Sequence, residues 1–183
     1  SGKVVSIYPG ANAFVVRRFI ASYTLSSIQP IHQAIALGRD SLPGGLMIDD
    51  HFSFLRSRTR RNVTDLPTQF RYELGVQDWN LIAFGFVPSF EELPDNQESG
   101  GGARVEYALS PANSLGASLM LGASPAIRRF AVRVFARLSP HSAWGLLSEF
   151  VFQNRTLLQS GNTQVGQTIL YLKPYWSPAQ WTE

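Results

Sequence analysis

The sequence predicts an all-β chain folded as an antiparallel up-and-down β-barrel of about eight to ten strands, each with two different faces. Three observations support this prediction. Polar and apolar residues alternate over most of the chain, as they do in a strand whose side chains point to opposite sides. A Ser-Pro turn recurs at Pro111, Pro140 and Pro178, a spacing that fits two strands with their connections. Tight turns also alternate with longer connections rich in glycine and charge.

Composition narrows the class of protein. The 183 residues suffice for one domain, and we treat residues 1–183 as a single barrel domain. A hydrophobic fraction of 44% excludes a disordered chain. No apolar run reaches the ~20 residues of a transmembrane helix, but alternating strands cross membranes at a mean hydropathy near zero, and here it is −0.04. Without cysteine there is no disulfide, thiolate metal site or cysteine nucleophile.

The first third of the chain predicts three strands separated by turn residues. The separators are Pro30, Pro43 and the Gly44-Gly45 pair, which interrupt strands. The segment Ile28–Leu37 leaves a short helix open as an alternative, because its apolar spacing fits both periods. The predicted strands are Asn12–Leu25, Gln29–Leu37 and Gly45–Ser57.

The densest basic stretch, Arg56–Asn62, follows these strands. Such runs are usually solvated loops. A site for single-stranded nucleic acid would need aromatic side chains between the basic ones, and the stretch contains none. The net charge of +3 is also only mildly basic, so no nucleic-acid partner is expected.

Six strands beyond residue 66 alternate cleanly. In Arg128–Leu138 every second residue is apolar from Phe130 on, and Arg129, Arg133 and Arg137 share the other face. A helix would scatter these arginines around its circumference. A seventh predicted strand, Val165–Trp176, is apolar on both faces and is not one of these six. The apolar faces of the other five are Phe70, Tyr72, Leu74 and Val76; Ile82, Phe84 and Phe86; Val105, Tyr107 and Leu109; Leu115, Ala117, Leu119 and Leu121; and Trp144, Leu146, Phe150 and Phe152.

The predicted connections fall into two groups, as in membrane barrels with short turns on one side and longer loops on the other. The glycine-rich stretch Glu98–Arg104 precedes a strand rather than a helix, so it predicts a flexible loop and no phosphate cradle. The tight turns are Val76–Asn80, Ser110–Ser114, Ser139–Ala143 and Ser177–Trp181; the longer connections are Glu91–Ala103, Gly122–Ala126 and Gln159–Gln164.

All four tryptophans, Trp79, Trp144, Trp176 and Trp181, lie at or close to a tight turn. Indole favours a membrane–water interface, because its ring is apolar while its N–H requires a partner. We therefore predict a membrane-interface girdle at one rim of the barrel. The alternative is that these rings cap the core of a soluble β-sandwich.

The stretch LPTQFRYELGVQDWNLIAFGF (Leu66–Phe86), followed by repeated strand–Ser-Pro–strand units up to Trp176, resembles bacterial outer-membrane β-barrel proteins of the channel or transporter type. The resemblance implies a location in the bacterial outer membrane and a function as a passive pore or as the barrel component of an envelope transport or assembly complex. It implies membrane lipid as a partner, other envelope protein subunits as a second class of partner, and no cofactor.

One departure from that family concerns the last residues. Barrels of this kind usually end on a strand with a terminal aromatic residue, whereas this sequence ends in SPAQWTE after another predicted turn. Either these residues are part of a longer barrel, or the barrel closes in an unusual way.

If the apolar face meets lipid, the polar face lines the lumen, and arginine and glutamate on neighbouring strands would pair there. A narrow barrel would be filled by this ladder, and a wider one would prefer anions. Arg133 and Arg137 are the first candidates for selectivity. The lumen-lining candidates are Arg71, Glu73, Arg104, Glu106, Arg129, Arg133, Arg137, Glu149 and Arg155.

Two other classes of function remain as alternatives. Asp49, His51 and Ser53 share strand parity, and this pattern is similar to that of outer-membrane lipid A deacylases, in which histidine is the base for a serine nucleophile. The position in the chain and the flanking residues differ from that family. The other class is a soluble all-β capsid or ligand-binding protein. No metal-ligand spacing is present, so the main prediction is a non-enzymatic barrel without metal.

Overall fold

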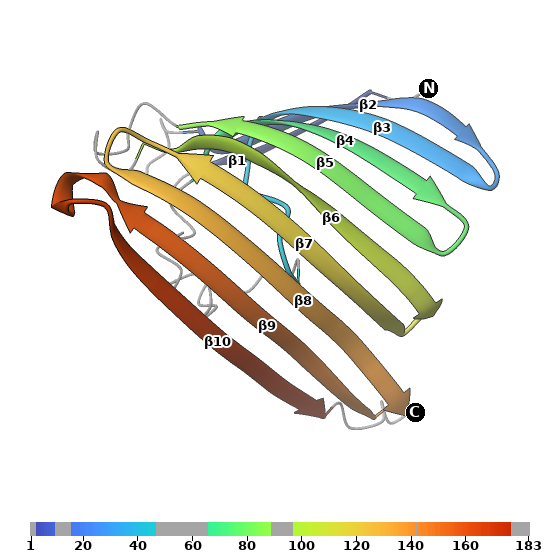
Figure 1. The fold of residues 1–183 in the computed structure, drawn as a ribbon. Helices are drawn as coiled ribbons and strands as arrows, with labels where there is room; N and C mark the ends of the chain where they lie inside the picture. The colour runs from blue at the N-terminus through green and yellow to red at the C-terminus, as the bar shows by residue number, and fades with distance from the viewer. Residues whose placement is uncertain (1–2, 10–15, 47–65, 89–96, 142, 177–183) are drawn as a thin grey trace.

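The computed structural model describes residues 3–9, 16–46, 66–88, 97–141 and 143–176. They form one sheet of ten antiparallel strands in chain order, so each strand pairs with its sequence neighbours (Figure 1). This confirms the predicted all-β, up-and-down class. The strands are β1 (Lys3–Pro9), β2 (Val16–Ile28), β3 (Ile31–Arg39), β4 (Thr68–Val76), β5 (Trp79–Val87), β6 (Ser99–Ser110), β7 (Asn113–Ala123), β8 (Ile127–His141), β9 (Trp144–Leu157) and β10 (Thr163–Trp176).

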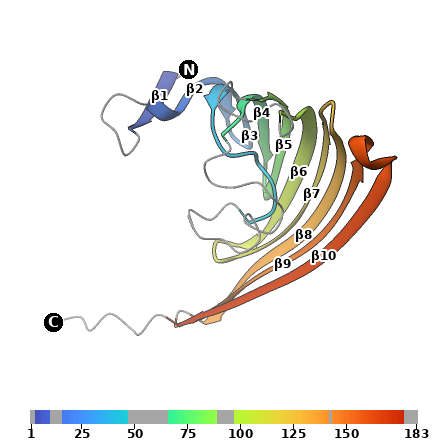
Figure 2. The same ribbon diagram turned by 90° about the vertical axis from the view of Figure 1, so that its left-hand side faces the viewer.

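The sheet curls into a trough with a concave and a convex face (Figure 2). Within the described residues β1 pairs only with β2 and β10 only with β9, so the sheet is not closed. The segment that follows β3 turns onto the concave side and runs under the later strands (Figure 2). The barrel prediction is therefore confirmed as far as a curved antiparallel meander, without closure.

The first third differs in detail from the prediction. The helix alternative for Ile28–Leu37 is wrong, because β3 pairs along its whole length with β2 and β4. The strand β1 was not predicted, and it pairs with the first half of β2. Of the predicted strand Gly45–Ser57, Gly45 and Leu46 are not in a strand, and the rest lies outside the described residues.

Register confirms the predicted faces of β4 and β6 to β9 and corrects β5. Ile82, Phe84 and Phe86 lie on the concave, polar face, because Ile82 is opposite Arg104 and Phe84 is opposite Gly102. They are 4–6% exposed, and Met120 and Ala131 pack with them into the main apolar cluster. Hydrophobicity alone could not reveal this phase, since Trp79 and Leu81 give the opposite face an apolar pattern too.

The flexible loop predicted over Glu98–Arg104 is also wrong. Ser99 begins β6, and the three glycines that follow pair with β5 and β7. A Cβ at Gly102 would overlap the Leu119 carbonyl oxygen and would lie 2.6 Å from the Phe84 ring. Glycine at position 102 therefore allows the Phe84 ring to lie against the concave face of the sheet.

Turns and connections lie at opposite ends of the trough, as predicted. Gln77–Asp78 and Pro111–Ala112 form tight turns at one end. At the other end Leu158–Ser160 forms one 3₁₀ turn, and Gly161 ends it in the left-handed conformation at φ 67°. Among the described residues no helix has the length and hydropathy to cross a bilayer.

Gly116 on the concave face of β7 and Gly166 on the exposed convex face of β10 provide a test of packing on the concave side. At Gly116 a Cβ would lie 2.6 Å from the Val105 carbonyl oxygen and would overlap the Phe135 ring, whereas at Gly166 no atom lies within 4 Å. We expect Gly116→Ala to lower the free energy of unfolding by about 1–3 kcal/mol, and Gly166→Ala to change it by less than about 0.5 kcal/mol. Urea unfolding followed by tryptophan fluorescence measures both, and equal effects would contradict the packing described here.

Candidate functional site

The most informative site lies where Asp40–Leu46, here called the inner segment, crosses the concave face. Its backbone is bound by side chains of five strands, β4 and β6 to β9. The Gly45 N–H donates to Ser118 Oγ at 3.2 Å, and the Leu46 N–H donates to Glu149 Oε2 at 3.0 Å. The Gln69 amide donates to the Ser41 carbonyl at 2.9 Å. These bonds satisfy backbone groups that the fold removes from water.

Two arginines hold the carbonyl side of the same segment. Arg104 Nε donates to the Gly45 carbonyl at 3.2 Å, and Arg133 Nη1 donates to the Gly44 carbonyl at 3.3 Å. Gly45 has a φ of 66°, and a Cβ there would overlap the Glu149 carboxylate. Only glycine combines that backbone conformation with so close an approach to a charged group.

Apolar contacts complete the docking of the inner segment. Leu42 packs against the concave cluster that includes Phe84 and Met120, and Pro43 is fully buried. Burial of these side chains adds a favourable hydrophobic term to the polar contacts. The inner segment is therefore held to the sheet by both apolar and charged groups.

The register places all nine predicted lumen candidates on this concave face, in rows across the strands. Arg133 and Glu149 pair across β8 and β9 at 3.7 Å, as predicted for neighbouring strands. Arg71–Glu73 at 3.1 Å and Arg104–Glu106 at 2.6 Å instead pair along a single strand. The Arg104 guanidinium also stacks on the Phe135 ring, 4.7 Å from its centroid.

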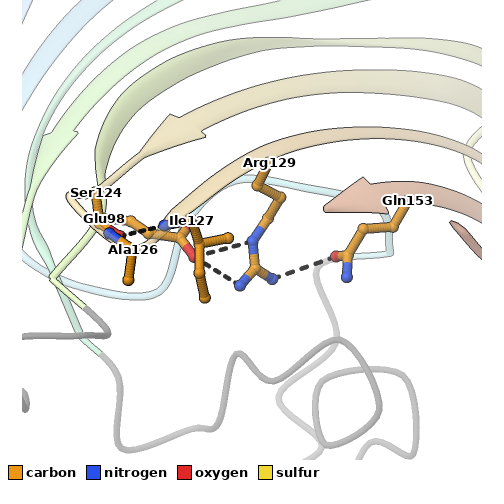
Figure 3. A network of polar contacts seen from close by, with 6 residues as sticks. All are labelled: Glu98, Ser124, Ala126, Ile127, Arg129 and Gln153. Atoms are coloured by element: carbon orange, nitrogen blue, oxygen red, sulfur yellow. Dashed lines mark hydrogen bonds and ion pairs between the residues drawn. The ribbon is translucent and has the colours of Figure 1, made fainter. Parts of the chain in front are cut away.

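Two acidic partners of the ladder were not predicted. Asp40 lies 3.7 Å from Arg71, and Glu98 accepts from Arg129 Nη2 at 2.6 Å and from Nε at 3.1 Å. Gln153 accepts a further bond from Arg129 at 3.3 Å (Figure 3). Both acids stand just outside a strand, so they were not among the residues assigned from the alternating strands. The available signal was parity, since Asp40 is two residues after Gly38 and Glu98 is two before Gly100.

The Arg129 network is almost completely enclosed. The side chains of Arg129 and Glu98 are 4% and 7% exposed, respectively. Such a buried pair is sustained only when its hydrogen-bonding groups are satisfied, and here the guanidinium reaches both Glu98 and Gln153 (Figure 3). The charge of Arg129 is thus neutralised by Glu98 within the concave face.

The convex face has the opposite character. Its described side chains are mostly large and apolar, and many are exposed: Leu170 is 64% exposed and Val134 is 54%. Soluble monomers rarely expose continuous apolar surfaces of more than a few hundred Å². Exposed convex residues include Phe19, Leu37, Phe70, Leu81, Val87, Leu115, Leu119, Leu121, Phe130, Phe150, Phe152 and Leu172.

Aromatic side chains gather on the convex face at the tight-turn end. Trp79 packs on Tyr107 with ring centroids 4.7 Å apart, and Trp144 lies 6.2 Å from Trp176. The three tryptophans are 47–63% exposed, so these rings do not cap a core within the described residues. Trp181 lies outside the described residues.

The hydrolase candidates Asp49, His51 and Ser53 also lie outside the described residues. Within the described part of the chain, no cluster of three or more His, Asp or Glu side chains could hold a metal ion.

No protein-family model matches the chain, and no curated protein or solved structure matches it. Its function is therefore inferred from the chemistry of its two faces.

Proposed function

We propose that this chain forms the wall of a bacterial outer-membrane β-barrel and acts as a passive pore or as the barrel component of an envelope transport complex. The observation that carries the proposal is that the polar and apolar faces of the sheet are exchanged relative to a soluble protein. Buried arginine and glutamate cover the concave side, while exposed Leu, Phe and Val cover the convex side. This is the arrangement expected when lipid surrounds a protein and the interior is polar.

The dimensions of the convex face support the same proposal. On β9 the exposed aromatic residues run from Trp144 to Phe152, which is about 27 Å along the strand and about 20 Å along the membrane normal at the usual strand tilt. The apolar band of outer-membrane barrels is about 25 Å tall and is bordered by aromatic residues. The Trp79, Trp144 and Trp176 cluster would lie in one interface.

Closure is a requirement of the proposal. An open strand edge inside lipid leaves backbone N–H and C=O groups without partners, which costs several kcal/mol per group. The edges of β1 and β10 must therefore pair with each other or with further strands in the membrane. The inner segment would then lie inside the lumen and narrow it, with Arg104 and Arg133 holding it in place.

Heat-modifiability on a semi-native SDS gel tests the proposal. A closed barrel resists SDS until it is boiled, so the unboiled protein, extracted from membranes or refolded in detergent, is expected to migrate differently from the boiled protein. Conductance of planar bilayers then tests the pore. Identical mobility of the two samples, together with solubility without detergent, would contradict the proposal and would indicate a soluble all-β protein whose convex face is covered by a partner.

A further inference from the structure

A groove on the convex face, near the connection end of β6 to β9, is not explained by a pore. Its volume is about 590 Å³, within the range of small-molecule sites. Six of the residues that line it matter for its chemistry: Leu121, Arg128, Phe130, Phe152, Asn154 and Thr156.

The strand register shows how far each of these residues lies from the connections at the ends of the strands. Arg128 is opposite Thr156 in the row nearest the connections, Phe130 is opposite Asn154 in the next, and Phe152 stands in the third. Leu121 on β7 is the other neighbour of Phe130. Successive rows on one face are about 7 Å apart. The groove is therefore polar and cationic at its rim and apolar toward the middle of the sheet.

Arg128 is exceptional on this face. In the described strands β4 to β10, the register assigns every other Lys, Arg, Asp or Glu to the concave face. Arg128 is exposed, and no described carboxylate pairs with it. The adjacent Arg129 faces the other way and is bonded to Glu98 and Gln153. A cation on a lipid-facing surface is unfavourable away from the interface, so its place at the rim is consistent with an anionic partner there.

We propose that this groove binds a membrane lipid with a phosphate headgroup, the phosphate on Arg128 and one acyl chain along Leu121, Phe130 and Phe152. Guanidinium groups bind phosphate oxygens in bidentate geometry. Asn154 and Thr156 also line the groove and add polar groups near Arg128. The inference rests on the proposed function, because it requires the convex face to meet lipid.

Native mass spectrometry of the delipidated protein in nonionic detergent, titrated with phosphatidic acid, provides the test. We expect Arg128→Gln to weaken lipid binding by about ten-fold or more, and Arg128→Lys to weaken it less. Phe130→Ala should also reduce affinity, through the acyl chain. Arg137→Gln is the matched control, since it removes the same charge from the concave face of the same strand.

Three outcomes would overturn the inference. Equal binding of phosphatidic acid by the wild type and by Arg128→Gln would show that Arg128 is exposed to solvent and does not bind the headgroup. Equal binding of diacylglycerol, which has the same acyl chains but no phosphate, would remove the role of the phosphate headgroup. Displacement of the lipid by inorganic phosphate at the same concentration would indicate a site for free anions. Each variant is first tested for heat-modifiability, so failure of the barrel itself is distinguished from failure of this site.

Discussion

Replacing Arg129 with methionine is expected to lower the free energy of unfolding by about 3–5 kcal/mol, because it leaves the Glu98 carboxylate buried without its guanidinium. Methionine keeps an unbranched apolar side chain similar to the aliphatic stem of arginine and removes the charge. The loss should appear as a lower urea midpoint of tryptophan fluorescence at an unchanged slope. It is the largest effect expected from any single substitution of the ladder.

The matched control for this prediction is the adjacent residue. Arg128 lies on the exposed convex face, so Arg128→Met should change stability in nonionic detergent by less than about 0.5 kcal/mol. A second test is the double variant Glu98→Leu/Arg129→Met, which should be more stable than Arg129→Met alone, since replacing both members of a buried pair is often close to neutral. Equal losses for Arg129→Met and Arg128→Met would show that the buried network contributes nothing.

Replacing Gly45 with leucine is expected to release the inner segment from the concave face. The new side chain would overlap the Glu149 carboxylate, and the φ of 66° costs a non-glycine residue about 1–2 kcal/mol. Loss of the charge-assisted bond from the Leu46 N–H adds about 1.5–3 kcal/mol. Together these terms shift the docking equilibrium by about 100-fold to several thousand-fold.

The chain has no cysteine, so a single introduced thiol reports on this release. Ser118 lies directly under Gly45, and a Ser118→Cys variant should react slowly with a maleimide until the inner segment leaves. We expect faster labelling when Gly45→Leu is added, and a larger conductance if the barrel is a pore. Gly44→Ala is the control, because its Cβ would meet Arg133 at an ordinary 3.5 Å. Equal labelling rates in the two variants would contradict the docked arrangement.

Period-two alternation predicted most of the fold because most of the strands have one charged or small-residue face and one large apolar face. The arginines of β8 are the clearest case, since Arg129, Arg133 and Arg137 all lie where parity puts them. The same rule was wrong for β5, where both faces are apolar and the deciding contacts, Arg104 and Gly102, come from β6. A single strand carries no information about its neighbour's chemistry.

Only one of the two parts of the candidate site, the arginine–glutamate ladder, could be predicted from the sequence. The ladder residues follow from alternation, but the inner segment does not, because its contacts are hydrogen bonds from backbone groups to distant side chains. Nothing in the stretch Asp40–Leu46 distinguishes a segment folded into the concavity from one in solvent. The two glycines predicted as a strand separator are instead the points at which the backbone passes closest to Arg133 and Glu149.

The inner segment also constrains the order of assembly. Its bonds to Ser118 and Glu149 join residues 73 and 103 positions apart in the chain, so they cannot form until β7 and β9 have been added to the growing sheet. If the chain forms the proposed membrane barrel, the interior would stay hydrated and unobstructed while the earlier strands insert, and the later strands would fix the inner segment across it. A chain cut before β9 would then keep its N-terminal meander but lack the carboxylate that anchors the segment, and a leaky intermediate is the expected product.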